Sequence, residues 1–293
     1  MSTIPHSIVC SAVDWITATT NSDDGTHELL DLATVVQSEA MKDDCTVRDW
    51  SWHGYNGRIG DHFSWGLRWD GAILQLHGYL AEKYWEQAAR RSANVTRIDI
   101  AVTVRYDEAQ EGVAEDAYLR GKRADEGNPR APSRSLIVSS GGGSTAYIGN
   151  RSSQVFARIY DKWRERNDEQ WRNCWRWEVE YKSDLANDCA TRLLASPDVP
   201  CAIRELVSSH YVRRSMAARW MADGRTMRLN AQRQPSTVAS RLCWLSDTCR
   251  PVVKRLLASV SILDLLFAVG LDSESIQVYQ ELPQNQLDGE TMD

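Results

Sequence analysis

The run Val95–Val104, with the sequence VTRIDIAVTV, constrains the fold more than any other part of the chain. It is almost continuously apolar, which is typical of a strand buried in the middle of a sheet. One acidic residue, Asp99, interrupts it and shares a face with Arg97, Ala101 and Thr103. A buried carboxylate without a partner is costly, so Asp99 needs a basic neighbour or a metal ion. We therefore expect a sheet built around this strand, with Asp99 as a candidate functional residue.

Two more strand-like segments lie on either side of a charged loop between residues 145 and 182. In the first segment, period-2 alternation places four polar or aromatic side chains on one face: Phe156, Arg158, Tyr160 and Lys162. In the second segment, the same period gathers four charged side chains: Arg176, Glu178, Glu180 and Lys182. The alternate residues include Val, Ile and Trp, which can be buried. The sequence thus predicts a strand pair with one apolar face and one face rich in functional groups.

Glu178 and Glu180 are the second candidate group. Alternate residues on a strand have Cα atoms about 7 Å apart, from a rise of roughly 3.3 Å per residue. Both carboxylates can therefore reach one hard cation, which takes oxygen ligands. Placed on a neighbouring strand, Asp99 would supply a third acidic ligand. A tyrosine beside such a cation loses its proton more easily and can attack a phosphodiester. The alternative is an antiparallel sheet whose exposed face carries ordinary cross-strand ion pairs.

Three sequence blocks resemble, in this order, those of the rolling-circle replication initiation factor family (Rep_trans type). They are TRIDIAVTV, YIGNRSSQVFARIYDK and WRWEVEYK. The middle block is the most specific, since Gly-x-Arg-x-Ser followed by Arg-Ile-Tyr-x-Lys is uncommon by chance. The resemblance covers roughly residues 8–260. One departure concerns Thr103, because many members of the family have a second acid at this position, which puts metal affinity or geometry in question.

The resemblance implies an enzyme that nicks one DNA strand at an origin and keeps the 5′ phosphate on a tyrosine, as an initiator of plasmid replication or a relaxase of an integrative element. It implies that Tyr160 is the nucleophile. The implied metal-binding residues, for Mg²⁺ or Mn²⁺, are Asp99, Glu178 and Glu180. Lys162 and Arg158 are expected to stabilise the phenolate and the charge that develops on the phosphate.

Two other functions remain open from the residues alone. Asp99 together with Glu180-x-Lys182 also fits the Asp…Glu-x-Lys pattern of metal-dependent nucleases that activate water. The second alternative is a non-catalytic DNA-binding regulator that has kept the fold. Phenylalanine at position 160 separates the first alternative from tyrosine nicking, because hydrolysis would survive that change. An absence of metal-stimulated nicking would favour the second alternative.

The distribution of charge indicates DNA as a partner although the net charge is −6. Between Pro200 and Arg255 there are eleven basic and three acidic residues, whereas from Ile262 onward there are seven acids and no Lys or Arg. A basic helical region followed by an acidic tail fits a protein that binds DNA through one surface. A solvated helical face beside an acidic tail is the alternative. The candidate DNA-binding residues are Arg151, Arg213, Arg214, Arg219, Arg225 and Arg228.

These observations predict an α+β protein with a mainly antiparallel central sheet, flanked by helices, and a C-terminal helical region. We expect a catalytic sheet domain over 1–183, a helical DNA-binding region packed on it over 184–262, and an acidic tail over 263–293. No run approaches the ~20 apolar residues of a membrane span. The seven cysteines have no Cys-x-x-Cys pair and indicate reduced thiols and a cytoplasmic location. A host helicase and a homodimer are further expectations for the partners.

Overall fold

The structure of the protein is a computed structural model, and it describes residues 6–21, 23–106, 112–140, 143–214, 221, 225 and 227–229. The chain divides into two compact units, Met1–Arg233 and Gln234–Asp293, and the described residues all belong to the first. This unit combines one large antiparallel sheet with helices, so the predicted α+β class is confirmed. None of the described helices is long and apolar enough to cross a membrane.

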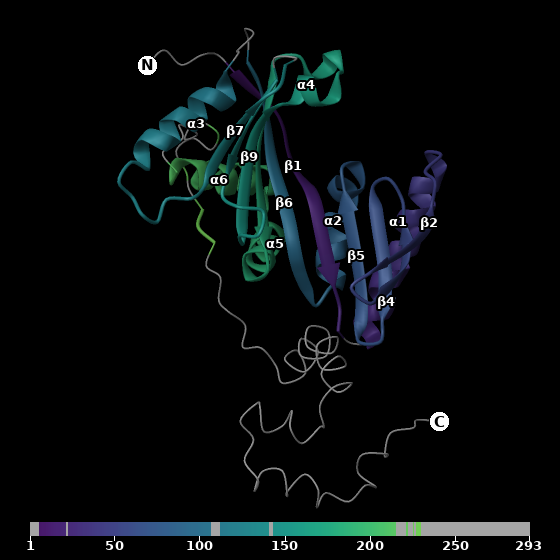
Figure 1. Cartoon of the computed structure of the whole chain (residues 1–293). Coiled ribbons are helices and arrows are strands. Elements are labelled where there is room, and N and C mark those ends of the chain that lie inside the picture. Colours follow the sequence, from purple (N-terminus) through teal and green to yellow (C-terminus); the bar gives the residue numbers. More distant parts are fainter. Residues whose placement is uncertain are drawn as a thin grey trace, which may run out of the picture. The chain divides into compact units, whose positions relative to one another are not determined.

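Ten strands of the described residues form a single sheet in the order β2-β3-β4-β5-β1-β6-β10-β9-β8-β7 (Figure 1). Every neighbouring pair is antiparallel. The strands are β1 (His6–Thr19), β2 (Arg48–Trp52), β3 (Tyr55–Ile59), β4 (Phe63–Arg68), β5 (Gly71–His77), β6 (Asn94–Tyr106), β7 (Arg134–Val138), β8 (Ser144–Ile148), β9 (Val155–Asp161) and β10 (Cys174–Lys182). The long strands β1, β6 and β10 therefore lie in the middle of the sheet, as expected for β6 from its apolar sequence.

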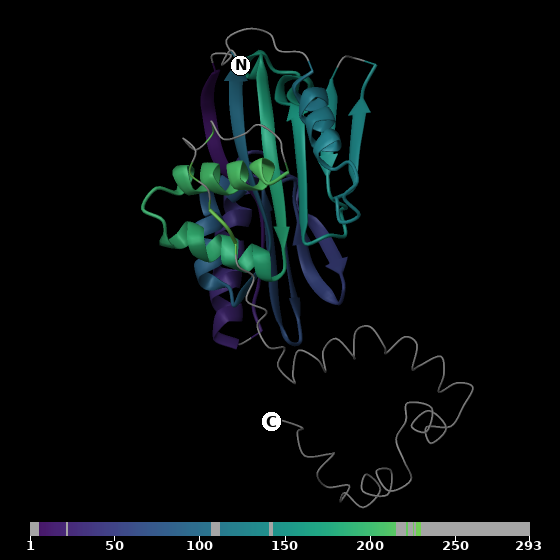
Figure 2. The same cartoon turned by 90° about the vertical axis from the view of Figure 1, so that its left-hand side faces the viewer.

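The longer helices cover one face of this sheet (Figures 1 and 2). Helix α2 packs on β1 and β5, α1 packs on β4 and β5, and α5 and α6 pack on β6 and β10. Helix α3 covers β7, β8 and β9. The helices are α1 (Asp23–Lys42), α2 (Tyr79–Arg91), α3 (Val113–Ala124), α4 (Lys162–Arg166), α5 (Asp184–Ala195) and α6 (Val199–Val212), with a 3-10 turn at Glu169–Trp171.

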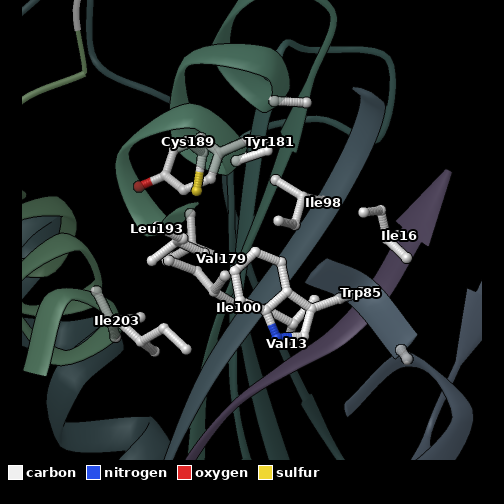
Figure 3. Close-up of a cluster of buried hydrophobic side chains, with 14 of the residues drawn as sticks. Val13, Ile16, Trp85, Ile98, Ile100, Val179, Tyr181, Cys189, Leu193 and Ile203 are labelled. Carbon is white, nitrogen blue, oxygen red and sulfur yellow. The ribbon is translucent and has the colours of Figure 1, made fainter. Parts of the chain in front are cut away.

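The hydrophobic core lies between the helices and the sheet. Ile98 and Ile100 of β6 are fully buried there and meet side chains from α2, α5 and α6 (Figure 3). Alternation along β6 and β10 sends Ile100 and Val179 to this core. Asp99, Glu178 and Glu180 consequently point to the opposite face, which the longer helices do not cover. The core thus sets which side of the sheet is available for chemistry.

Most of the expected elements are present, with one local difference. The region expected to be helical from residue 184 onward contains α5 and α6. Strand β9 ends at Asp161, so Lys162 begins helix α4 instead of continuing the strand. The side chain of Asp161 accepts a hydrogen bond from the Arg164 amide and caps this helix. Residues 230–293 lie outside the described part, so the proposed domain boundaries stay predictions.

Candidate active site

The strand register brings the three sequence blocks together on the uncovered face. Asp99 of β6 is paired with Glu180 of β10. On its other side, β10 pairs Glu178 with Arg158 and Arg176 with Tyr160. Directly opposed residues in a sheet have Cβ atoms about 4.5–5.5 Å apart, so these side chains are close enough to interact. The period-2 prediction therefore placed Tyr160, Arg158 and the three acids correctly on one surface.

The hydroxyl of Tyr160 has a direct hydrogen-bond acceptor in Glu178. It donates to Glu178 Oε2 at 3.2 Å. The other carboxylate oxygen, Oε1, accepts from Arg158 Nε at 2.8 Å and lies 2.7 Å from Arg158 Nη2. Both Tyr160 and Glu178 are buried, at 6% and 3% exposure. The tyrosine proton is thus held against a carboxylate that a guanidinium keeps in position.

This environment keeps Tyr160 protonated in the free protein. Burial raises the pKa of its hydroxyl well above the ordinary value, and the negative charge of Glu178 raises it further. The cationic side chains of Arg176 and Arg158 act in the opposite direction. Any reaction of this hydroxyl as a nucleophile would therefore need a base to take its proton and cations to stabilise the phenolate.

Arg176 is the cation that the sequence reasoning left without a role. Its side chain is 6% exposed, with Nη2 at 2.7 Å from Asp14 and Nε at 3.7 Å from Glu178. Nη1 donates to the hydroxyl of Thr103 at 3.4 Å. Asp14 reaches this site because the pairing of β1 with β6 shifts between Val13 and Trp15, which is the effect of a β-bulge. The sequence did contain a signal for Arg176, because this arginine lies on the charged face of β10, a strand that is buried on both faces.

Asp99 and Glu180 share one basic partner. Arg97 donates to both oxygens of Asp99, at 2.9 and 2.6 Å, and its Nη2 also lies 3.2 Å from Glu180 Oε2. Lys182 is 2.7 Å from Glu180 Oε1. The guanidinium of Arg97 stacks on Trp15, 4.4 Å from its ring centroid. Burial raises the pKa of Asp99, and the hydrogen bonds from Arg97 oppose that rise.

The three acids have the oxygen atoms that a divalent metal prefers as ligands, but their side chains are not arranged around a common point. Carboxylate oxygens are the ligands that Mg²⁺ and Mn²⁺ prefer. In the described part of the chain, however, no three Asp, Glu, His or Cys side chains gather as metal ligands. Asp99 and Glu180 hold Arg97 between them, so this guanidinium must move before a metal can bind both. The residues therefore fit the metal in the chemistry of their oxygens, and their side chains would have to draw together around it.

The comparison with protein families decides which family this site belongs to. The model of the replication initiation factor family matches residues 93–261, which include all three blocks. The chain belongs to the replication initiation factor family. The rolling circle replication initiator protein from Geobacillus stearothermophilus is similar in structure, with a TM-score of 0.51 and 17% sequence identity over 76% of this chain and 99% of that chain. At this identity the likeness establishes a shared fold. The comparison with curated proteins gave no match.

Within this family member, Lys162 lies beside the predicted nucleophile but is already paired. Its Nζ is 5.5 Å from the centroid of the Tyr160 ring and 2.5 Å from Glu165 Oε2. The side chain is buried, and burial together with Arg176 lowers the pKa of its ammonium group. Lys162 thus adds positive charge near Tyr160 from the start of α4.

The arginines proposed for DNA binding do not gather at one place. Arg151 lies next to the site, with its guanidinium 5.3 Å from the centroid of the Phe156 ring and its carbonyl oxygen accepting from Lys182. Arg213 and Arg214 follow α6, which packs on the opposite face of the sheet. Arg225 pairs with Glu205 at 3.2 Å and Arg228 is exposed. Arg219 lies outside the described residues. Arg151 is thus the one of these described arginines that borders the site.

A residue of helix α6 that we did not predict supports the site from behind. The hydroxyl of Tyr211 lies 2.8 Å from the backbone oxygens of both Arg158 and Glu178. Its ring packs edge-on against Trp177 at 4.9 Å between centroids. Tyr211 is fully buried and links α6 to the two strands that carry the predicted nucleophile, Tyr160, and its hydrogen-bond acceptor, Glu178. No local sequence signal distinguishes such a tyrosine from an ordinary core residue.

Proposed function

We propose that this family member nicks one strand of DNA at a specific site and retains the 5′ phosphate on Tyr160. The observation that carries the proposal is the hydrogen bond from the Tyr160 hydroxyl to Glu178, enclosed by Arg158 and Arg176. A nucleophile, a proton acceptor and two cations in one cluster are what phosphoryl transfer to a tyrosine needs.

In the proposed reaction, the Tyr160 oxygen bonds to phosphorus while the bond from phosphorus to the 3′ oxygen breaks. The tyrosine proton passes to Glu178, which already accepts it at 3.2 Å. The released 3′ oxygen takes a proton from water and becomes the hydroxyl that can prime synthesis. Arg176 and Arg158 offset the negative charge of the phenolate and of the phosphate in the transition state.

We further propose that Asp99 and Glu180 hold Mg²⁺ or Mn²⁺, with Glu178 as the third acid of the group. A bound divalent cation would polarise the scissile phosphate and help to orient it. In the free protein, Arg97 neutralises the two carboxylates instead. Arg97 and the metal therefore compete for the same pair of carboxylates.

This competition predicts that Arg97→Gln strengthens metal binding. Removing the guanidinium leaves Asp99 without its basic partner and Glu180 with Lys182 alone, so a divalent cation meets less competition for these two carboxylates. We expect the dissociation constant for Mn²⁺ to fall about tenfold, which corresponds to roughly 1.4 kcal/mol. Calorimetric titration of the full chain measures this without any need for activity. Arg90→Gln, on the exposed side of α2, is the matched control and should leave the constant unchanged. Equal or weaker binding by Arg97→Gln would mean that Arg97 organises the acids instead of competing for them.

The proposed function is tested by covalent trapping. The wild-type chain is incubated with single-stranded oligonucleotides that carry a randomised central segment, in the presence of Mg²⁺ or Mn²⁺. We expect a protein–DNA adduct that survives denaturation, whose modified peptide contains Tyr160 and whose DNA is joined through its 5′ end. Cleavage products without an adduct would instead support the hydrolytic nuclease, for which Asp99 and the Glu180–Lys182 pair, 2.7 Å apart, supply the residues.

DNA is the partner that this proposal requires. Arg151 is suited to contact the phosphate backbone next to the site, because it is exposed and borders Phe156 on the same face. Arg213, Arg214, Arg225 and Arg228 are proposed for duplex recognition, and Arg213 and Arg214 follow helix α6 on the face opposite the nicking site. Arg219 is proposed for the same role from the sequence alone, because it lies outside the described residues. This separation fits a division in which backbone contacts position the strand and base contacts specify the origin. A host helicase and a homodimer stay predictions.

A further inference from the structure

A cavity opens beside the predicted nucleophile, on the side away from Asp99. Its volume is about 310 Å³, and its lining comes from strands β7 to β9 and helix α4. Tyr160 and Arg158 of β9 are among its lining residues, as are Thr145 and Tyr147 of β8. Thr145 is the strand partner of Tyr160, and Tyr147 is the strand partner of Arg158. The cavity and the nicking site thus share the nucleophile as a common wall.

The lining of the cavity suits one nucleoside. Sites for small molecules have volumes of about 300–1,000 Å³, so this cavity is at the lower end of that range. Tyr147 supplies an aromatic surface and is held by stacking on Phe156, with ring centroids 5.7 Å apart. Aromatic side chains of this kind stack on nucleobases. Thr145 adds a hydroxyl, and Arg164 adds a cation at the edge.

The two acids of the lining are already engaged. Asp161 accepts the backbone N–H of Arg164 at 3.1 Å, and Glu165 binds Lys162 at 2.5 Å. Their charges are therefore offset by the start of helix α4 and by an ammonium group. A sugar and phosphate next to Arg158 and Arg164 would not face uncompensated carboxylates. This balance favours a nucleic-acid strand over a cationic ligand.

The stereochemistry of the proposed reaction selects which nucleotide enters. In an in-line displacement, the leaving 3′ oxygen lies across the phosphorus from the attacking tyrosine oxygen. The released nucleotide is therefore on the far side of the phosphate from Tyr160. The nucleotide that keeps the 5′ phosphate is bonded to phosphorus through an oxygen outside the line of attack. It can therefore lie alongside the Tyr160 side chain. Tyr160 is one of the residues that line the cavity, so a nucleotide that lies alongside this tyrosine can enter it.

We propose that this cavity binds the first retained nucleotide, the one whose 5′ phosphate becomes joined to Tyr160; this inference rests on the proposed function. Tyr147 stacks on its base and Thr145 hydrogen-bonds to its edge or sugar. The cavity thereby places the scissile phosphate over the tyrosine hydroxyl. Thr145 and Tyr147 act as positioning residues, since they touch the substrate away from the reacting atoms.

The test uses single-stranded oligonucleotides that carry the nick site mapped by the trapping experiment. One oligonucleotide has an abasic residue at the first retained position, and another has it at the last released position. We expect the abasic residue at the retained position to lower kcat/KM for adduct formation about tenfold with the wild-type chain. Tyr147→Ala should lower kcat/KM for the intact oligonucleotide by a similar factor. In that variant the retained abasic residue should cause little further loss, because both changes remove the same contact.

Further variants separate a contact from a folding defect. Tyr147→Phe keeps the ring and should retain most of the wild-type rate, whereas Thr145→Val loses the hydroxyl and should lower the rate. Thr191→Val, in helix α5 on the opposite face, is the matched control for a lost threonine hydroxyl and should match wild type. Additive losses from Tyr147→Ala and the retained abasic residue would overturn the proposal. The proposal would also be overturned if the loss from Tyr147→Ala were non-additive with the abasic residue at the last released position instead of the retained one. If the wild-type chain forms no adduct with any oligonucleotide, it is the proposed function itself that fails.

Discussion

Tyr160→Phe is expected to abolish covalent attachment of DNA while leaving duplex binding nearly unchanged. The substitution removes one hydroxyl and keeps the ring, so the packing of this buried side chain should hardly change. Without the oxygen there is no atom to form the bond to phosphorus, and Glu178 loses the proton that it would accept. Adduct formation on denaturing gels, alongside duplex binding at one salt concentration, measures both effects.

The same variant distinguishes tyrosine nicking from the hydrolytic alternative. A water-activating nuclease would still cut DNA after Tyr160→Phe, because Asp99, Glu180 and Lys182 are intact in that variant. If an adduct still forms, another tyrosine is the nucleophile. Tyr147 is the first to test, because it is half-buried and lines the cavity. Tyr181 is 2% exposed and lies in the core cluster with the helices, so it cannot reach a phosphate without unfolding.

Arg176→Met is expected to cause the largest loss of stability among substitutions at the site. The guanidinium is buried and compensates Asp14 and Glu178, at 2.7 and 3.7 Å. Removing one partner of a buried ion pair costs about 3–5 kcal/mol, because the remaining charge is left without compensation. Urea denaturation of the variant should therefore show a midpoint far below that of the wild-type chain, provided that unfolding stays two-state.

Two further variants test this explanation of the loss. Arg120→Met breaks an exposed ion pair with Asp116 on helix α3 and should cost less than about 1 kcal/mol. Combining Arg176→Met with Asp14→Asn should recover part of the lost stability, because the uncompensated carboxylate has been removed. A loss for Arg176→Met no larger than that for Arg120→Met would mean that water or another cation replaces the guanidinium.

The face of the site could be predicted because side-chain alternation is local. A residue on a strand points to the face opposite its neighbours whatever the strand pairs with, so Tyr160 and Glu178 fell on their correct sides. The apolar run of β6 also indicated its central place, since a strand buried on both faces has few polar positions. Lys162 departs from this pattern because its conformation depends on the helix cap at Asp161, which competes with continuation of the strand.

The amino-acid sequence by itself determined the α+β class, the central position of β6, and the set of acids and basic residues that share one face with Tyr160. Only the tertiary structure decided which of them meet. The register between strands selects Asp99 with Glu180 and Glu178 with Arg158, and a bulge in β1 brings Asp14 to Arg176. The contact of Tyr211 with two strand carbonyls and the cavity beside β8 likewise join segments far apart in the chain. Such contacts depend on how sheet and helices pack as a whole, and no local periodicity encodes that packing.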